Sequence, residues 1–441
     1  MSKDMNLLSL AENLVNYSKS KNVDEIQVSI ANEDEFTVEV RNGEIERLTE
    51  SVSKGVSIKV ILDKRVATAS TSDFDDETLK FLVDDAIERA KLSSQDEFAG
   101  LPDEFFDKSQ EIDLEIYDPL LEEIQPEIKI NIAKEIEQIC LADKRIKLSE
   151  GSFFQSGFGE VFIANSKGFS GSFKSTSCSS GVYLHSADEN NSYEEGWWSN
   201  SVNFNGLMKP EEIAKIAINR VTRLIGAKKI ETQKVPVIFE RPMTSMLLGF
   251  LASCLNGHSI YMNQSFLVDK LGQKIAGENI NIIDDGLIKG AIGSRLFDRE
   301  GVPTRKLSLI ENGTLNSYIL DTYSGRKLGL KSTGHASGVT NFYLDKGNTN
   351  PDEIIKSTDK GLLLTRTIGQ GTNPTTGDLS RGAFGLWIEK GEIAFPVAEI
   401  TISGNLKDLL NSIEILGDDL IFDRSITGPT IKVAEMTVAG I

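Results

Sequence analysis

Residues 26–62 read IQVSIANEDEFTVEVRNGEIERLTESVSKGVSIKVIL, and their pattern indicates the class of fold. Apolar and polar residues alternate over 28–40 and again over 56–62, which is the two-residue period of a half-buried strand. Between the two runs, Asn42-Gly43 supplies residues that tolerate the positive φ angles of a type I′ turn. The stretch therefore predicts two antiparallel strands joined by a tight hairpin.

Helical patterns flank this predicted sheet. Apolar residues recur at helical spacing over 7–15 and over 79–87. Acidic residues at 73–76 precede the second run, where they can cap a helix and interact favourably with its N-terminus. Residues 95–115 are acidic and interrupted by proline and glycine, as is typical of a linker. We expect an N-terminal α+β domain over 1–105.

A second unit repeats the order of helix, strands and helix. A helix is predicted over 119–143, followed by strands rich in serine, glycine and phenylalanine over 147–205. Pro210 is suited to the first position of another helix, which is expected to end near Gly226. These elements predict a central α+β domain over 112–230.

The remaining residues, 234–441, are rich in strand formers and glycine. Asn312-Gly313 and Lys390-Gly391 mark two more hairpins, and helices are predicted over 242–255 and 351–359. Because strands occur in runs and do not alternate with helices, the class is α+β. We expect N-terminal layers of helix and antiparallel sheet, followed by a large antiparallel β-rich C-terminal domain with one buried helix.

Composition restricts the classes of function. The 441 residues include 66 acidic and 47 basic side chains, which give a net charge of −19. Such a surface repels phosphate backbones, so nucleic-acid binding is not expected. There is no apolar run near the roughly 20 residues needed to cross a bilayer, and no signal peptide is evident at the N-terminus. The expectation is a soluble cytoplasmic protein without a membrane partner.

Histidines are too few and too scattered to predict a metal site. The chain has three, His185, His258 and His335. A catalytic zinc ion usually takes three protein ligands, but no two of these histidines have helical metal spacing and none has a neighbouring glutamate as general base. His258 is interpreted as a turn residue. His335 lies in the loop 332–338, whose small residues would let a ligand approach, or it is simply a loop histidine bonded to backbone.

Other catalytic patterns are incomplete. Gly369-Gln370-Gly371 lacks the remaining residues of a phosphate-binding loop, and the serines at 175–180 contain no nucleophile elbow. The acidic pairs Asp284-Asp285 and Asp418-Asp419 are interpreted as solvated turn residues. The cysteines form no Cys-x-x-Cys pair and are interpreted as buried small hydrophobic residues. They are Cys140, Cys178 and Cys254.

Several segments, taken together and in order, resemble one known family. The likeness is to the TldD/PmbA family, most strongly to its TldE (PmbA) branch, and it covers nearly the whole chain from the hairpin at Arg41-Asn42-Gly43-Glu44 onward. The segments that carry it in the C-terminal half are 297–304 (FDREGVPT), 310–315 (IENGTL), 323–336 (YSGRKLGLKSTGHA) and 399–408 (EITISGNLKD).

The resemblance implies that the catalytic positions are vacated in this chain. The TldD branch carries a helix with His-Glu-x-x-x-His, in which the histidines bind zinc and the glutamate activates water. In the similar helix here, Gly249 and Phe250 stand at the first histidine and the glutamate, and Cys254 stands at the second histidine. The TldD branch also uses a cysteine near its C-terminus, and segment 426–430 has none. We therefore expect no metal or cofactor in this chain, with zinc in a partner subunit.

The resemblance further implies a non-catalytic subunit that pairs with a TldD-type zinc metallopeptidase to degrade or trim small extended peptides. A homodimer of the isolated chain is left open. Alternatives are a self-sufficient metallopeptidase with an unrecognised site, and a regulatory binding protein of the gyrase-modulator type. Loops rich in glycine and serine can hold an extended peptide by strand addition. The predicted groove residues are Ser332, Thr333, Gly334, His335, Gly369, Gln370 and Gly371.

Overall fold

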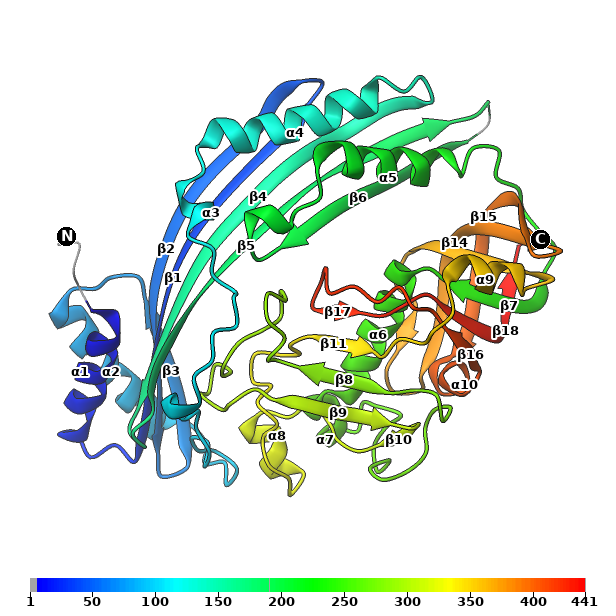
Figure 1. Cartoon of the computed structure of the whole chain (residues 1–441). Coiled ribbons are helices and arrows are strands. Elements are labelled where there is room, and N and C mark those ends of the chain that lie inside the picture. The colour runs from blue at the N-terminus through cyan, green and yellow to red at the C-terminus, as the bar shows by residue number, and fades with distance from the viewer. Residues whose placement is uncertain (1–5, 190, 441) are drawn as a thin grey trace.

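The computed structural model describes residues 6–189 and 191–440, and in this part of the chain six long strands form one antiparallel sheet. Their order is β3-β2-β1-β4-β5-β6. The sheet joins the two predicted N-terminal domains, because β1 pairs with β4 from Gln27 opposite Asn165 to Val40 opposite Ser152 (Figure 1). The bounds are β1 (Glu25–Arg41), β2 (Glu44–Leu62), β3 (Arg65–Thr71), β4 (Ile146–Asn165), β5 (Ser170–Ala187) and β6 (Ser192–Ser201).

The hairpin between β1 and β2 is confirmed. Arg41 pairs with Glu44, and the two residues between them have φ angles of 54° at Asn42 and 78° at Gly43. Both angles are positive, as a type I′ turn requires. Local sequence therefore determines where this long pair of strands reverses direction.

The N-terminal helices cover one face of this sheet. Even-numbered residues of β1 are buried at both ends of the strand: Ile26 packs with α1 and α2, and Val38 packs with α3 and α4. Because side chains alternate between faces, these helices lie on the same side, the outer side of the curved sheet (Figure 1). They are α1 (Leu7–Lys19), α2 (Asp76–Leu92), α3 (Leu120–Glu123), α4 (Pro126–Leu141) and α5 (Pro210–Thr222).

The single helix predicted over 119–143 is wrong, because the chain forms two helices there. α3 ends at Glu123 and α4 begins at Pro126. Gln125 is extended, with φ of −63° and ψ of 144°. A proline ring disfavours the helical conformation in the residue before it, whereas proline itself is well suited to the first turn.

The C-terminal part contains a five-stranded sheet and a larger sheet with a closed ring. The small sheet has the order β10-β9-β8-β11-β17. In the larger sheet, β14 pairs with both β15 and β12, so β12, β7, β18, β15 and β14 close on themselves. Two pairs are parallel, β11 with β17 and β12 with β7. The bounds are β7 (Gln233–Phe239), β8 (Ile282–Asp285), β9 (Lys306–Glu311), β10 (Thr314–Leu315), β11 (Phe342–Leu344), β12 (Lys360–Ile368), β13 (Thr372–Asn373), β14 (Asp378–Glu389), β15 (Glu392–Asn405), β16 (Ile413–Leu416), β17 (Ile426–Thr427) and β18 (Ile431–Ala439).

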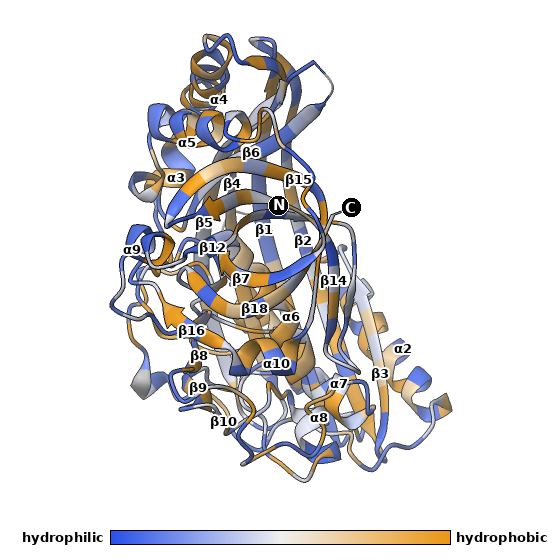
Figure 2. Ribbon diagram, turned by 90° about the vertical axis from the view of Figure 1, so that its right-hand side faces the viewer, coloured by the Kyte–Doolittle hydropathy of each residue, from blue (hydrophilic) through white to orange (hydrophobic). Residues whose placement is uncertain are grey.

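Helix α6 (Arg241–Leu255) is the buried helix of this part. It contacts β7, β11, β12 and β17, strands that belong to both sheets, and Figure 2 shows its apolar residues within the domain. The predicted α+β class, with a β-rich C-terminal domain, is confirmed. Among the described residues, no helix is long and apolar enough to cross a membrane. The shorter helices are α7 (Gly257–Tyr261), α8 (Thr322–Lys327), α9 (Pro351–Lys356) and α10 (Leu406–Asn411).

Candidate functional site

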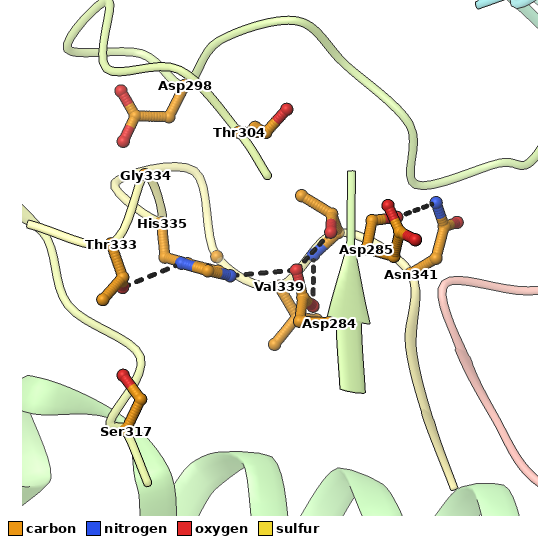
Figure 3. Close-up of polar contacts among 12 residues, drawn as sticks. Asp284, Asp285, Asp298, Thr304, Ser317, Thr333, Gly334, His335, Val339 and Asn341 are labelled. Atoms are coloured by element: carbon orange, nitrogen blue, oxygen red, sulfur yellow. Dashed lines mark hydrogen bonds and ion pairs between the residues drawn. The ribbon is translucent and has the colours of Figure 1, made fainter. Parts of the chain in front are cut away.

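A buried network links the loop after α8 to strand β8. His335 Nε2 lies 2.9 Å from Asp284 Oδ1, and its Nδ1 lies 2.9 Å from the Thr333 hydroxyl (Figure 3). The backbone N–H of Thr340 donates to the other oxygen of Asp284 at 2.8 Å, and the Thr340 hydroxyl donates to the first. Both ring nitrogens and both carboxylate oxygens are thus engaged inside the protein, where they fix the loop to the sheet.

The interpretation of Asp284 as a solvated turn residue is wrong. Asp284 does not lie in a turn. It belongs to strand β8, and its side chain is fully buried. A buried carboxylate needs hydrogen-bond donors, and they come from His335 and Thr340, far along the chain. Its neighbour Asp285 is half-buried and accepts from the backbone of Leu287.

We expect Asp284→Asn to lower the free energy of unfolding by about 1–3 kcal/mol, because an amide presents N–H groups to partners that are themselves donors. Asp285→Asn keeps an oxygen for the Leu287 N–H and should change it by less than about 0.5 kcal/mol. Urea denaturation measures both. Equal effects of the two variants would show that the buried network does not stabilise the fold.

Arg220 ties the central sheet to the C-terminal part. Its guanidinium contacts Glu195 of β6 at 2.7 Å, Glu240 at the start of α6 at 3.0 Å and the Thr365 carbonyl of β12 at 2.9 Å. Arg223 also contacts Glu240 at 2.6 Å. Burial would raise the pKa of Glu240, but hydrogen bonds and charge from Arg223 and Arg220 hold it below its ordinary value. The carboxylate is therefore stable as an anion inside the protein.

The largest described cavity, of about 760 Å³, lies between the inner face of the long sheet and the C-terminal part. Burial raises the pKa of Glu300 in its wall, against a hydrogen bond from Thr322 and the charge of Lys59. Sequence patterns missed this site because Lys59 and Glu300 come from distant segments. The residues that line it are Gln27, Ser29, Ser57, Lys59, Val66, Thr68, Ser94, Asp96, Phe98, Ala99, Gly100, Arg299, Glu300, Asp321 and Tyr323.

Helix α6 carries the three positions at which the resemblance implied lost catalytic groups. A Cβ atom on Gly249 would meet no atom within 4 Å, so this position borders open space. Phe250 and Cys254 are buried in the apolar core, and the Cys254 sulfur lies 4.0 Å from the Pro374 carbonyl. Glycine and phenylalanine offer no metal-binding side-chain atom.

Comparison with known proteins matches almost the full length of the chain. Sequence models described as PmbA/TldA metallopeptidase domain 1, central domain and C-terminal domain match residues 27–90, 119–225 and 232–440. A curated relative, the metalloprotease PmbA homolog of Buchnera aphidicola, is 33% identical over 438 residues, which are 99% of this chain and 98% of the relative. The chain belongs to the PmbA/TldD family.

Solved structures of similar proteins agree with this PmbA/TldD membership. A Bacteroides thetaiotaomicron protein described as a candidate modulator of DNA gyrase is 30% identical, with a TM-score of 0.94 and 100% coverage of both chains. TldE from Thermococcus kodakarensis has a TM-score of 0.87 over 97% of this chain and 99% of its own, and at 24% identity it shows the shared fold.

The α6 residues do not fit the metal ion that the name of the PmbA/TldD metallopeptidase family implies. A zinc site takes several side-chain ligands, and of the three α6 positions only Cys254, buried in the apolar core, carries a donor atom. Gly249 and Phe250 cannot bind a cation or activate water through their side chains. Among the described residues, no three His, Cys, Asp or Glu side chains are grouped to hold a metal ion.

The structure places the predicted groove residues in two separate regions. Ser332, Thr333, Gly334 and His335 lie in the loop beside β8, whereas residues 369–371 connect β12 with β13 in the other sheet. No hydrogen bond or ion pair among the described residues joins the two segments. Ser332 lines a small cavity of about 150 Å³, while Thr333 and His335 bond internally. Peptide binding by this set stays a prediction.

Proposed function

We propose that this chain is a non-catalytic subunit of TldE/PmbA type that pairs, in the cytoplasm, with a TldD-type zinc metallopeptidase to degrade or trim small extended peptides. One observation carries the proposal: Gly249 and Phe250 of α6 have no side-chain atom that can bind zinc or act as a base, and Cys254 offers only a single buried thiol. Hydrolysis by a zinc site needs both. The chain then acts by helping to hold substrate while its partner supplies the metal.

The family resemblance and the inner face of the long sheet support a peptide as the substrate. The sheet exposes polar residues to the largest described cavity, as Ser29 of β1 and Ser57 of β2 illustrate. Small polar walls can accommodate main chain with varied side chains, since main-chain hydrogen bonds do not depend on peptide sequence.

Adding the purified chain to its TldD-type partner should raise the rate of cleavage of an unfolded peptide at least tenfold over the partner alone. The two should co-purify, with one zinc ion per partner chain, because only the partner has ligands for it. Peptide fluorescence and elemental analysis of each chain measure this. An unrelated acidic protein at equal concentration is the control, and cleavage by the partner that ignores this chain would refute the proposal.

A self-sufficient metallopeptidase is the second candidate, because the Buchnera relative is itself named a metalloprotease. It requires stoichiometric zinc in the isolated chain and cleavage that a chelator abolishes. A regulatory role is favoured by the gyrase-modulator descriptions of two similar solved structures, and pull-down of purified gyrase at moderate salt tests it.

A further inference from the structure

Strand β6 leaves one edge of the long sheet open. It is the last strand in the order of that sheet and lies at its margin (Figure 1). On one side it pairs with β5, and among the described residues no backbone hydrogen bond outside that pairing engages residues 194–198. In an antiparallel ladder every second residue directs its N–H and C=O to the free side. This stretch can therefore accept one more strand.

The free edge borders a pocket of about 180 Å³, which we call the β6 pocket. Residues 194–198 all line it, and because side chains alternate between the two faces of a sheet, such a pocket lies along the edge of the strand. Gly196 has no side chain, so its backbone itself borders the pocket. The rest of the lining comes mainly from the C-terminal part, including Pro242 of α6, Arg366 of β12 and Arg424.

The walls of the β6 pocket are held at a fixed separation. The buried guanidinium of Arg220 contacts Glu195 of β6 at 2.7 Å and donates to the Thr365 carbonyl of β12 at 2.9 Å. Further along β6, the Asn200 side chain donates to the Asp423 carbonyl at 3.2 Å. Fixed walls lose little conformational entropy when a ligand binds, so the pocket is preorganised.

Aromatic rings give the β6 pocket a preference for apolar groups. Tyr183 lies opposite Gly196, two residues from Trp198, so both rings stand on the same face of the sheet. Their centroids are 5.9 Å apart, and Tyr183 remains 39% exposed. Exposed aromatic surface gains free energy when another apolar group covers it. The pocket is smaller than the roughly 300–1,000 Å³ of sites for drug-sized ligands, which suits a single side chain.

The charged groups around the β6 pocket form ion pairs with one another. Arg366 contacts Glu194 at 3.5 Å, and Arg424 contacts Asp423 at 3.2 Å. These pairs leave no excess charge of either sign for an ionic ligand to neutralise. The open groups are main-chain N–H and C=O on the strand and aromatic surface beside them. An extended peptide with an apolar side chain presents both of the matching groups.

We propose that the free edge of β6 binds a short extended peptide as an added strand, and that the β6 pocket takes one aromatic or large aliphatic side chain of that peptide. The inference rests on the proposed function for the choice of a substrate peptide as the occupant. Between Glu195 and Asn200 the edge spans about 17 Å at roughly 3.4 Å per residue, the length of four or five extended residues. Main-chain hydrogen bonds supply affinity and the pocket supplies selectivity.

Titration of the isolated full chain with two uncharged peptides tests the pocket without the partner. The probes are an N-acetylated, C-terminally amidated pentapeptide of alanine with phenylalanine in the centre, and the same peptide with alanine there. Tryptophan fluorescence reports binding, since Trp197 and Trp198 line the pocket. We expect the phenylalanine peptide to bind at least tenfold more tightly, because burial of this side chain is worth about that factor or more.

Tyr183→Ala should lower the affinity for the phenylalanine peptide about fivefold, because it removes one aromatic contact. The affinity for the alanine peptide should stay within about twofold, since main-chain bonds do not involve this ring. Phe81→Ala is the matched control, because Phe81 is 69% exposed on α2, away from the β6 pocket. It should leave both affinities unchanged, and thermal unfolding should show that both variants remain folded.

A second set of peptides tests the added strand. One N–H at a time is replaced by an N-methyl group in the phenylalanine peptide. Because only alternate residues direct their N–H to the neighbouring strand, methylation should lower affinity about tenfold at every second position and less than about threefold at the positions between.

Equal affinity for the two peptides, absence of binding, or methylation effects without alternation would each overturn the inference. So would loss of co-purification of Tyr183→Ala with the TldD-type partner, because the partner would then be the occupant of this edge. Failure of the proposed function is read separately, as partner cleavage that ignores the chain.

Discussion

Arg220→Met is expected to lower the free energy of unfolding by about 3–5 kcal/mol, because the buried Glu195 loses its close cation and Glu240 keeps only Arg223. Among the described residues, only Arg220 contacts Glu195, Glu240 and the Thr365 carbonyl at once. Methionine keeps much of the side-chain volume, so the loss is electrostatic and not a cavity. Urea denaturation followed by tryptophan fluorescence measures it, since Trp197 lies beside the guanidinium.

The control for Arg220 is an exposed ion pair. Lys274 contacts Glu278, four residues further along a loop, at 2.6 Å, and both side chains are more than half exposed. Lys274→Ala should change the free energy of unfolding by less than about 0.5 kcal/mol. If Arg220→Met cost no more than this control, the network would not be what holds β6, α6 and β12 together.

The three thiols of the folded chain should react with Ellman's reagent at pH 8 about a thousandfold more slowly than those of the unfolded chain. Burial raises the pKa of Cys140, Cys178 and Cys254 to about 12, from a model-compound value of 9.0. Because only the thiolate reacts, a rise of this size lowers the reactive fraction by roughly three powers of ten.

Absorbance of the released thiolate measures these rates, and the same chain in guanidinium chloride is the control, in which all three thiols should react. A fast reaction of one thiol in the folded chain would contradict the burial of that cysteine. If that thiol were Cys254, it would also reopen α6 as a metal-binding helix, because a thiolate there could bind zinc.

Local features of the fold were predictable from sequence, and distant pairings were not. Asn42-Gly43 located a hairpin because only a few residue types tolerate its backbone angles. Asp284 was misinterpreted because its donors, His335 and Thr340, lie more than fifty residues away. The break between α3 and α4 was missed although Pro126 signals it, since apolar periodicity continues on both sides.

The candidate site was less predictable than the fold. The loss of catalytic groups from α6 is inferred from family resemblance. The structure shows in addition that Gly249 borders open space and that Cys254 is buried. The cavity is lined by residues from two distant regions, as Lys59 of the long sheet and Glu300 of the C-terminal part illustrate, which no spacing rule in a single sequence encodes.

The pairing of β1 with β4 has a consequence for biosynthesis. Residues 27–40 of β1 find their partners at 152–165, so at roughly 5–20 residues per second the ribosome completes β4 on the order of ten seconds after β1. During this interval the nascent hairpin carries an open strand edge, which is prone to pair with other chains. Three consecutive acidic residues, Glu33 to Glu35, lie midway along that edge, and charged side chains on an open strand edge oppose such pairing.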